Sequence, residues 1–277
     1  MWDWLCDAPH RYREEDKAIL RSTFGYAQND RLTISMNTFD ELKRNLEQVE
    51  ATIEGACRRA NRSRGEITLI AVTKMHPAAA IAAAAELGVT HIGENKVQEF
   101  DTKQAEWNTL RDAHKLRAHL IGHLQSNKAA RAAALFDAVD SVDSLRLAER
   151  LETAAAANGR MLPVLVEIKL SDEETKSGLA PGSAAFEELF ERLPQLSHLN
   201  VRGLMTVPPY LRDAEAVRPY FRRLSELRDE SARRHPKLQL DALSMGMTHD
   251  YAVAIEEGAT EIRLGTALFG ARDYSRS

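Results

Sequence analysis

The residue best suited to covalent chemistry is a lysine that closes an apolar segment. ITLIAVTK (67–74) is a nearly continuous apolar run, as expected of a parallel strand covered on both faces, and it ends in Lys74. Burial lowers the pKa of an ammonium group, and a deprotonated amine can form a Schiff base with an aldehyde. The alternative is a lysine whose ammonium reaches solvent or pairs with an acid, and Lys74 alone favours this alternative.

Two later segments could hold a phosphate group. Ser244-Met245-Gly246-Met247-Thr248 ends one expected strand, and Arg263-Leu264-Gly265-Thr266 lies in the last one. Backbone N–H groups beside glycine bind phosphate, and the hydroxyl groups add donors. Glycine and serine also end many strands for turn geometry alone, so each segment by itself indicates little. Together with Lys74, they predict a ligand that carries both a phosphate and a carbonyl group.

Arg263 precedes Gly265 by two residues, so both should share one face of their strand. If that face is the interior, the guanidinium is buried and needs a partner. Arginine keeps its proton, so opposite a pyridine nitrogen it would leave that nitrogen unprotonated. The alternative is a structural ion pair with Glu261 or Glu167.

His119 and His123 are four residues apart on a segment expected to be a strand. No acidic motif of the kind that accompanies helical metal-binding histidines lies beside them, so we expect no metal site. His123, at the expected end of the strand, could instead contact a bound ring.

The chain from residue 65 to residue 274 alternates strands and helices and would bring these residues together. The expected strands are 67–74, 89–95, 117–125, 137–144, 161–170, 199–207, 238–248 and 259–270. Eight βα units predict a parallel sheet closed into a single (β/α)8 TIM barrel, with the active site at the carboxyl ends of the strands. An open doubly wound sheet is the alternative, and the lack of G-x-G-x-x-G after the first strand weakens it.

Residues 1–36 do not continue this pattern. They contain five of the chain's seventeen aromatic residues and show no helical or strand period. We expect 1–36 to be an extension that is poorly ordered or is translated upstream of a natural start at Met36; an aromatic docking arm is the alternative. The domain then covers 37–277, and it opens with an amphipathic helix over 38–62 that we expect Thr38 and Glu41 to cap.

The composition excludes several classes of protein. With 37 basic and 41 acidic residues, the net charge of −4 argues against nucleic-acid binding through a general basic field. Two cysteines provide neither a disulfide framework nor a zinc quartet, which is typical of a reducing compartment, and we expect a cytoplasmic location. No apolar run is long enough for a membrane span, so no membrane association is expected.

Seven motifs in the same order resemble the YggS/PROSC family of pyridoxal-phosphate-binding proteins, also called PLP homeostasis proteins. The motifs are LIAVTK (69–74), HIGENKVQEF (91–100), HLIGHLQSNKA (119–129), TKSGL (175–179), VRGLMTVPP (201–209), LSMGMTHD (243–250) and IRLGTALFGARDY (262–274). The resemblance implies a barrel like the N-terminal domain of alanine racemase, preceded by a helix, with pyridoxal 5′-phosphate (PLP) held as a Schiff base.

The resemblance also implies a role for each site residue. Lys74 would form the Schiff base, Arg263 would face the pyridine nitrogen, and the remaining residues would hold the phosphate (Ser244, Gly265 and Thr266) or line the cofactor (Asn95, His123 and Met205). The chain departs from many relatives at Met75-His76, Lys96 and Thr248, which puts any shared surface recognition in doubt.

A racemase needs two bases on opposite faces of the substrate carbon. Racemases that this fold resembles take the second base from an additional domain, and this sequence ends at Ser277, directly after the eighth unit. We therefore expect a protein that buffers and delivers PLP, affects amino-acid and keto-acid pools indirectly, and is a monomer whose other partners are apo-PLP enzymes. The alternatives are a PLP enzyme such as a weak amino-acid racemase, and a phosphosugar-binding barrel enzyme without PLP.

Overall fold

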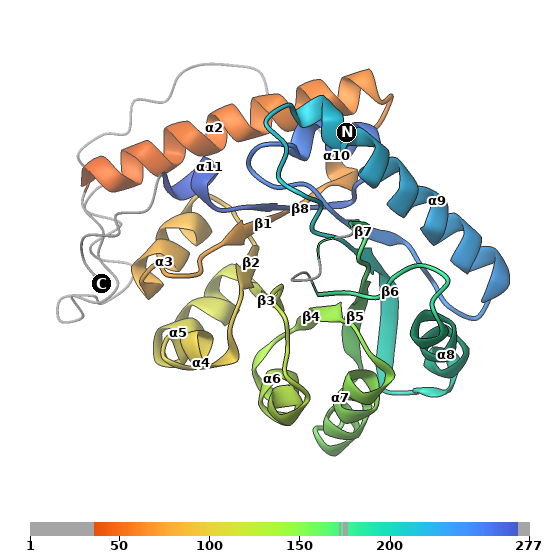
Figure 1. Cartoon of the computed structure of the whole chain (residues 1–277). Helices are drawn as coiled ribbons and strands as arrows, with labels where there is room; N and C mark the ends of the chain where they lie inside the picture. The colour runs from red at the N-terminus through yellow and green to blue at the C-terminus, as the bar shows by residue number, and fades with distance from the viewer. Residues whose placement is uncertain (1–35, 172, 174–176, 271–277) are drawn as a thin grey trace, which may run out of the picture.

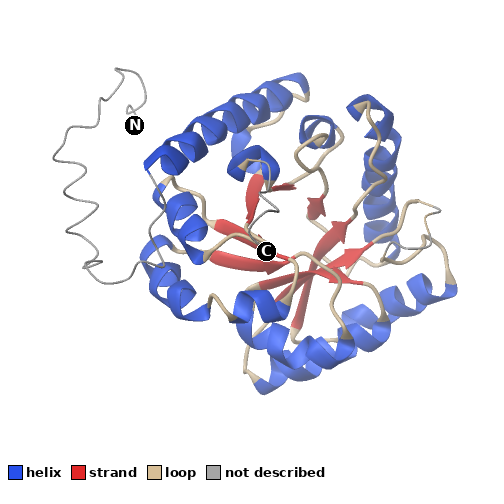
Figure 2. Cartoon of the chain, turned by 60° about the vertical axis from the view of Figure 1, so that its left-hand side comes forward, coloured by secondary structure: helices blue, strands red, loops and turns tan. Residues whose placement is uncertain are grey.

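The protein forms a closed barrel of eight parallel strands whose order in space equals their order in the chain (Figure 1). The computed structural model describes residues 36–171, 173 and 177–270; the expectations for 1–35 and for parts of the 175–179 and 262–274 motifs lie outside these residues. The predicted (β/α)8 barrel is confirmed. Helices surround the strands on the outside (Figure 2).

Each strand is shorter than the sequence predicts. The strands are β1 Thr68–Val72, β2 His91–Glu94, β3 Arg117–Leu120, β4 Ala138–Val142, β5 Leu162–Glu167, β6 Leu199–Met205, β7 Ala242–Ser244 and β8 Glu261–Leu264. The α-helices are α2 Met36–Arg59, α3 Ala78–Glu86, α4 Val97–Asp101, α5 Gln104–His114, α6 Ala129–Leu135, α7 Leu145–Ala157, α8 Ala184–Arg192, α9 Arg218–Arg234, α10 Tyr251–Glu256 and α11 Thr266–Phe269.

Two strand boundaries correct the predicted site. The expected strand 259–270 ends at Leu264, because Gly265 leaves the extended conformation (φ −110°, ψ −78°) and its carbonyl accepts the N–H groups of Leu268 and Phe269 to begin α11. The expected strand 117–125 ends at Leu120, so His123 lies in the following loop. The prediction that His119 and His123 share a strand is wrong.

Helix α2 takes the position that an eighth outer helix would fill. Since α11 has four residues, it covers little of β8 and β1, and α2 packs against α10 and α11 on that side (Figure 1). Asn45 Nδ2 donates to the carbonyl of Leu268 at 2.9 Å. The helix begins at Met36, so Thr38 lies inside it and the predicted capping box is wrong. The leading helix is therefore an integral part of the barrel.

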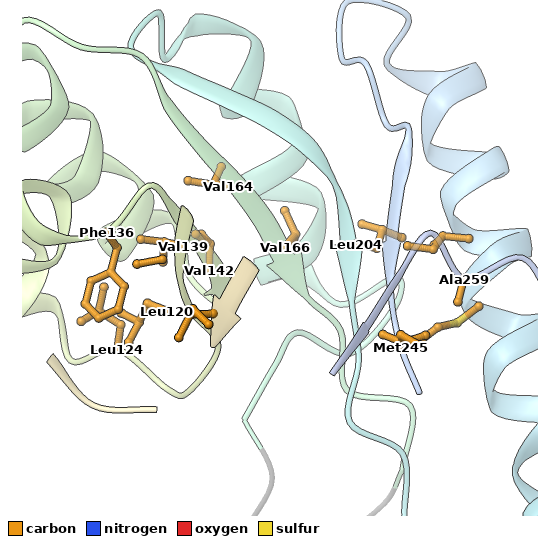
Figure 3. Close-up of a cluster of buried hydrophobic side chains, with 14 of the residues drawn as sticks. Leu120, Leu124, Phe136, Val139, Val142, Val164, Val166, Leu204, Met245 and Ala259 are labelled. Atoms are coloured by element: carbon orange, nitrogen blue, oxygen red, sulfur yellow. The ribbon is translucent and has the colours of Figure 1, made fainter. Parts of the chain in front are cut away.

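The outer side of the barrel wall is apolar, whereas its inner side carries both apolar and polar side chains. Side chains such as Val139, Val164, Val166 and Leu204 point outward and pack beneath the helices (Figure 3). A separate small cluster of Leu165, Met205 and Ala242 comes from the alternate, inward positions. None of the described helices combines the length and apolar content that crossing a membrane requires.

Candidate functional site

Lys74 lies directly beyond the carboxyl end of β1 and is half-buried. Thr73 N–H donates to the carbonyl of Gly93 at 3.0 Å, which extends the β1–β2 ladder by one residue past Val72. Strand alternation, continued past Thr73 into the turn that holds Lys74, puts Lys74 on the same inward side as Ile70 and Val72. A lysine in this place can present its amine to a ligand at the barrel mouth.

Arg263 is the buried cation of the barrel interior. It is 4% exposed, and its residue partner on β1 is Ile70. Its guanidinium donates to Ser244 Oγ and to the carbonyl of Thr206, each at 2.7 Å. Among the described residues, no carboxylate oxygen forms a salt bridge with it, so the alternative interpretation, an ion pair with Glu261 or Glu167, is wrong. Hydrogen bonds to neutral oxygens fix the guanidinium instead.

Ser244 and the turn after β8 have features that suit an anion. Because Ser244 Oγ accepts a hydrogen bond from Arg263, its own O–H remains able to donate. At Gly265 an added Cβ would meet its nearest neighbour, the carbonyl oxygen of Val72, at 3.5 Å, an ordinary contact. Packing therefore does not require glycine there, and its bare backbone leaves room for a ligand to approach. Thr266 is exposed beside it, at the start of α11.

Asn95 and His123 are brought together by a close approach of two loops. A Cβ on Gly122 would lie 2.4 Å from the carbonyl oxygen of Asn95, so only glycine fits between these backbones. His123 Nδ1 lies 2.9 Å from Asp143 Oδ2, and its side chain is 54% exposed. Asn95 is half-buried. The two residues follow β2 and β3 on the same rim as Lys74.

Met205 is fully buried as the last residue of β6. Its neighbours in register are Glu167 on β5 and Ser244 on β7. The eight predicted site residues thus lie on the inward side or the carboxyl rim of the barrel, on or after β1, β2, β3, β6, β7 and β8. Whether they bind a common ligand stays a prediction.

Glu167 lies beside Met205 in the same part of the barrel. The sequence suggests Glu167 only as an ion-pair partner of Arg263, not as a residue of the site. It is 7% exposed, and its Oε2 has no hydrogen-bond partner among the residues that the structure describes. Burial, and then the nearby negative charge of Asp143, raise the pKa of Glu167 to about 7, while the charges of Arg263 and His123 act in the opposite direction. The sequence carries a signal for Glu167 as a site residue, because this acidic residue ends the otherwise apolar segment VLVE.

Replacing Glu167 with glutamine is expected to change how stability depends on pH. The unfolded carboxyl group loses its proton near pH 4.5, whereas the folded one keeps it up to about pH 7. Between about pH 4.5 and pH 7, the folded state binds a proton at Glu167 that the unfolded state has lost. The free energy of unfolding therefore falls as pH rises through this range. Because glutamine does not ionise, Glu167→Gln should exceed wild type by about 1–3 kcal/mol at pH 8 and match it at pH 4.

Denaturant unfolding at the two pH values measures this difference. Glu226→Gln is the matched control, since its side chain is 54% exposed on α9. The control should follow the wild-type pH dependence. An equal offset of Glu167→Gln at both pH values would show that the carboxyl group does not ionise in this range.

A chain of hydrogen bonds crosses the barrel interior beneath the site. His91 Nδ1 lies 2.9 Å from His119 Nε2, and His119 Nδ1 lies 2.9 Å from Asp140 Oδ2. Burial, and then the charge of His119, lower the pKa of His91 to about 4. Burial would lower the pKa of His119 as well, but Asp140 outweighs it and raises that pKa. The two histidines therefore differ in the direction of their pKa shifts, because only His119 contacts a carboxylate.

His119, Asp140 and Glu261 offer ligand atoms within 4.8 Å of one another. Burial lowers the pKa of Arg263, and the charges of Asp140 and Glu261 offset part of that effect. His123 pairs with a different acid, Asp143, on the rim. The two histidines singled out by their spacing therefore have separate surroundings.

Comparison with known proteins agrees with the observed fold. Residues 38–273 match the family model described as alanine racemase, N-terminal domain. The pyridoxal phosphate homeostasis protein of Aquifex aeolicus is 42% identical over 239 residues, which cover 86% of this chain and all of that protein. Its Escherichia coli K12 counterpart is 41% identical over 241 residues, covering 86% and 99%. The chain belongs to the pyridoxal phosphate homeostasis protein family.

Solved structures place the chain beside members of this family. PipY of Synechococcus elongatus PCC7942, determined with PLP bound, is 39% identical, with a TM-score of 0.73, and the match covers 83% of this chain and all of PipY. The alanine racemase of Clostridium difficile 630 is 17% identical, with a TM-score of 0.61, over 85% of this chain and 58% of the racemase. The similarity to the racemase shows only that the two proteins share a fold.

Proposed function

We propose that this chain binds PLP as a Schiff base on Lys74 and takes part in PLP homeostasis by buffering and delivering the cofactor. The observation that carries the proposal is the position of Lys74 just beyond the end of β1, because β1 pairs with β8, which bears Arg263 and leads into Gly265. An amine, a buried guanidinium and a glycine turn suited to an anion thus lie on, or directly after, two adjoining strands. The PLP-bound structure of PipY supports the choice of ligand.

The residues present suit this cofactor. When bound, PLP supplies an aldehyde that condenses with a primary amine, with loss of water, and a ring that can accept electrons. The Ser244 hydroxyl and the backbone at Gly265 and Thr266 would donate to the phosphate. Arginine side chains keep their proton in proteins, so Arg263 would leave the pyridine nitrogen unprotonated, which weakens the ring as an electron acceptor. This arrangement favours holding the cofactor over transforming amino acids with it.

An absorbance spectrum before and after borohydride reduction tests the covalent step. Purified protein incubated with PLP should become yellow, and reduction should remove the colour and leave a stable adduct. Mass mapping should place that adduct on the peptide containing Lys74. A colourless protein that ignores added PLP would contradict the proposal and favour a phosphosugar-binding barrel.

Two further measurements separate buffering from catalysis. Incubation of the PLP-loaded protein with L-amino acids in D₂O should give no appreciable deuterium at Cα; sustained exchange would support a racemase. Mixing the loaded protein with an apo-PLP enzyme should restore that enzyme's activity. Recovery no faster than that from an equal amount of free PLP would argue against direct delivery.

A further inference from the structure

A buried ammonium group lies immediately outside the barrel wall behind Lys74. Lys103 joins α4 to α5 and is 7% exposed. Its Nζ donates to the carbonyl of Thr73 at 3.0 Å and to Glu94 Oε1 at 2.8 Å. A third, longer contact of 3.3 Å reaches Glu99 Oε1. All three donors of the ammonium are therefore directed to fixed acceptors.

These acceptors hold the backbone on both sides of Lys74. Thr73 is bound twice, since its carbonyl accepts from Lys103 and its Oγ1 donates to Glu94 Oε1 at 2.7 Å. The N–H of Met75 donates to the Glu99 carboxylate. Met75 has a left-handed backbone (φ +63°), a conformation that non-glycine residues keep only where their surroundings hold it. Lys103 thus contacts the residue before Lys74 directly and the residue after it through Glu99.

We infer that Lys103 is a positioning residue that fixes the direction and exposure of the Lys74 amine. This inference rests on the proposed function of Lys74. Thr73 and Glu94 lie on the outer side of the wall, whereas strand alternation turns Lys74 inward. Because Lys103 and Glu99 hold Thr73 and Met75 from outside the wall, the Lys74 side chain can face the barrel mouth. The backbone cannot then rotate to carry the amine away.

A double variant that removes both buried charges separates the effect of Lys103 on the stability of the fold from its effect on the position of Lys74. Burial raises the pKa of Glu94, and Lys103 offsets part of that effect. Lys103→Met alone leaves a buried carboxyl group without its cation, which destabilises the fold. Lys103→Met combined with Glu94→Met removes both charges, and such apolar replacement of a buried pair is often tolerated. The double variant still lacks the hydrogen bonds to Thr73, so it isolates positioning from stability.

The experiment compares wild type, Lys103→Met, the double variant and Lys237→Met, a control at an exposed lysine before β7. In each full-length protein, the PLP dissociation constant and the pH-dependent rate of acetylation of Lys74 are measured, together with thermal unfolding. Both Lys103 variants should bind PLP about tenfold more weakly, as expected for the loss of a charge-assisted hydrogen bond. They should also show a shifted pH profile for Lys74 acetylation, and Lys237→Met should match wild type.

Acetylation distinguishes this inference from the proposed function, because it reports on the Lys74 amine without PLP. A wild type that forms no PLP adduct would refute the proposed function, while a shifted Lys74 profile in both Lys103 variants would still establish the positioning role. If the stably folded double variant keeps the wild-type acetylation profile, the positioning role is refuted, whatever the PLP affinity.

Discussion

Replacing Lys74 with alanine should abolish the reducible PLP adduct and leave the barrel folded. Without its amine, no Schiff base can form at this position, so the yellow colour and the borohydride-stable adduct should both disappear. Lys74 is half-buried and lies beyond the end of β1. The free energy of unfolding should therefore change by no more than about 1 kcal/mol. Absorbance, mass mapping and denaturant unfolding measure the three quantities.

Lys96→Ala is the matched control, because Lys96 is an exposed lysine near the same rim. It should keep the colour and the adduct. An adduct that persists in Lys74→Ala would place the reactive amine elsewhere. If Lys74→Ala no longer shows a cooperative unfolding transition, Lys74 stabilises the fold through a contact that its position beyond the strand end does not predict.

The architecture could be predicted because parallel strands buried on both faces leave a nearly continuous apolar signal. Segments such as LIAV and VLV identify strand centres, and the helical stretches between them require parallel crossovers. Strand ends were less predictable. β8 ends where the φ and ψ of Gly265 turn the chain into α11, and nothing in the apolar pattern marks that change. The partners of α2 were equally hidden, since an amphipathic helix shows which side is buried but not what covers it.

The site could be predicted where chemistry depends on residue type at a strand end, as at Lys74 and Arg263. It could not be predicted where function depends on contacts between distant residues. Lys103 lies 30 residues from Thr73 in the chain, and only the fold brings its ammonium to that carbonyl. The hydrogen bonds of Arg263 go to neutral oxygens, which the nearby acidic residues in the sequence did not suggest.

Replacing Arg263 with methionine should cause the largest loss of stability among these variants. Burial lowers the pKa of Arg263, and the charges of four nearby carboxyl groups act in the opposite direction: Asp140, Glu261, Glu167 and Asp250. Removing the cation leaves buried acidic groups without compensation and leaves Ser244 Oγ and the Thr206 carbonyl without their donor. Loss of one member of such a buried charged set costs about 3–5 kcal/mol. Denaturant unfolding at pH 8 measures it.

The pH dependence of that loss tests its cause. Burial raises the pKa values of Glu167 and Glu261, so at pH 5 both are largely protonated and need no cation. The destabilisation by Arg263→Met should therefore be smaller at pH 5 than at pH 8. Arg222→Met is the control, since Arg222 is 58% exposed and solvent screens its ion pair with Glu257. An equal loss at both pH values would mean that Arg263 stabilises the barrel through packing and its two hydrogen bonds, not through its charge.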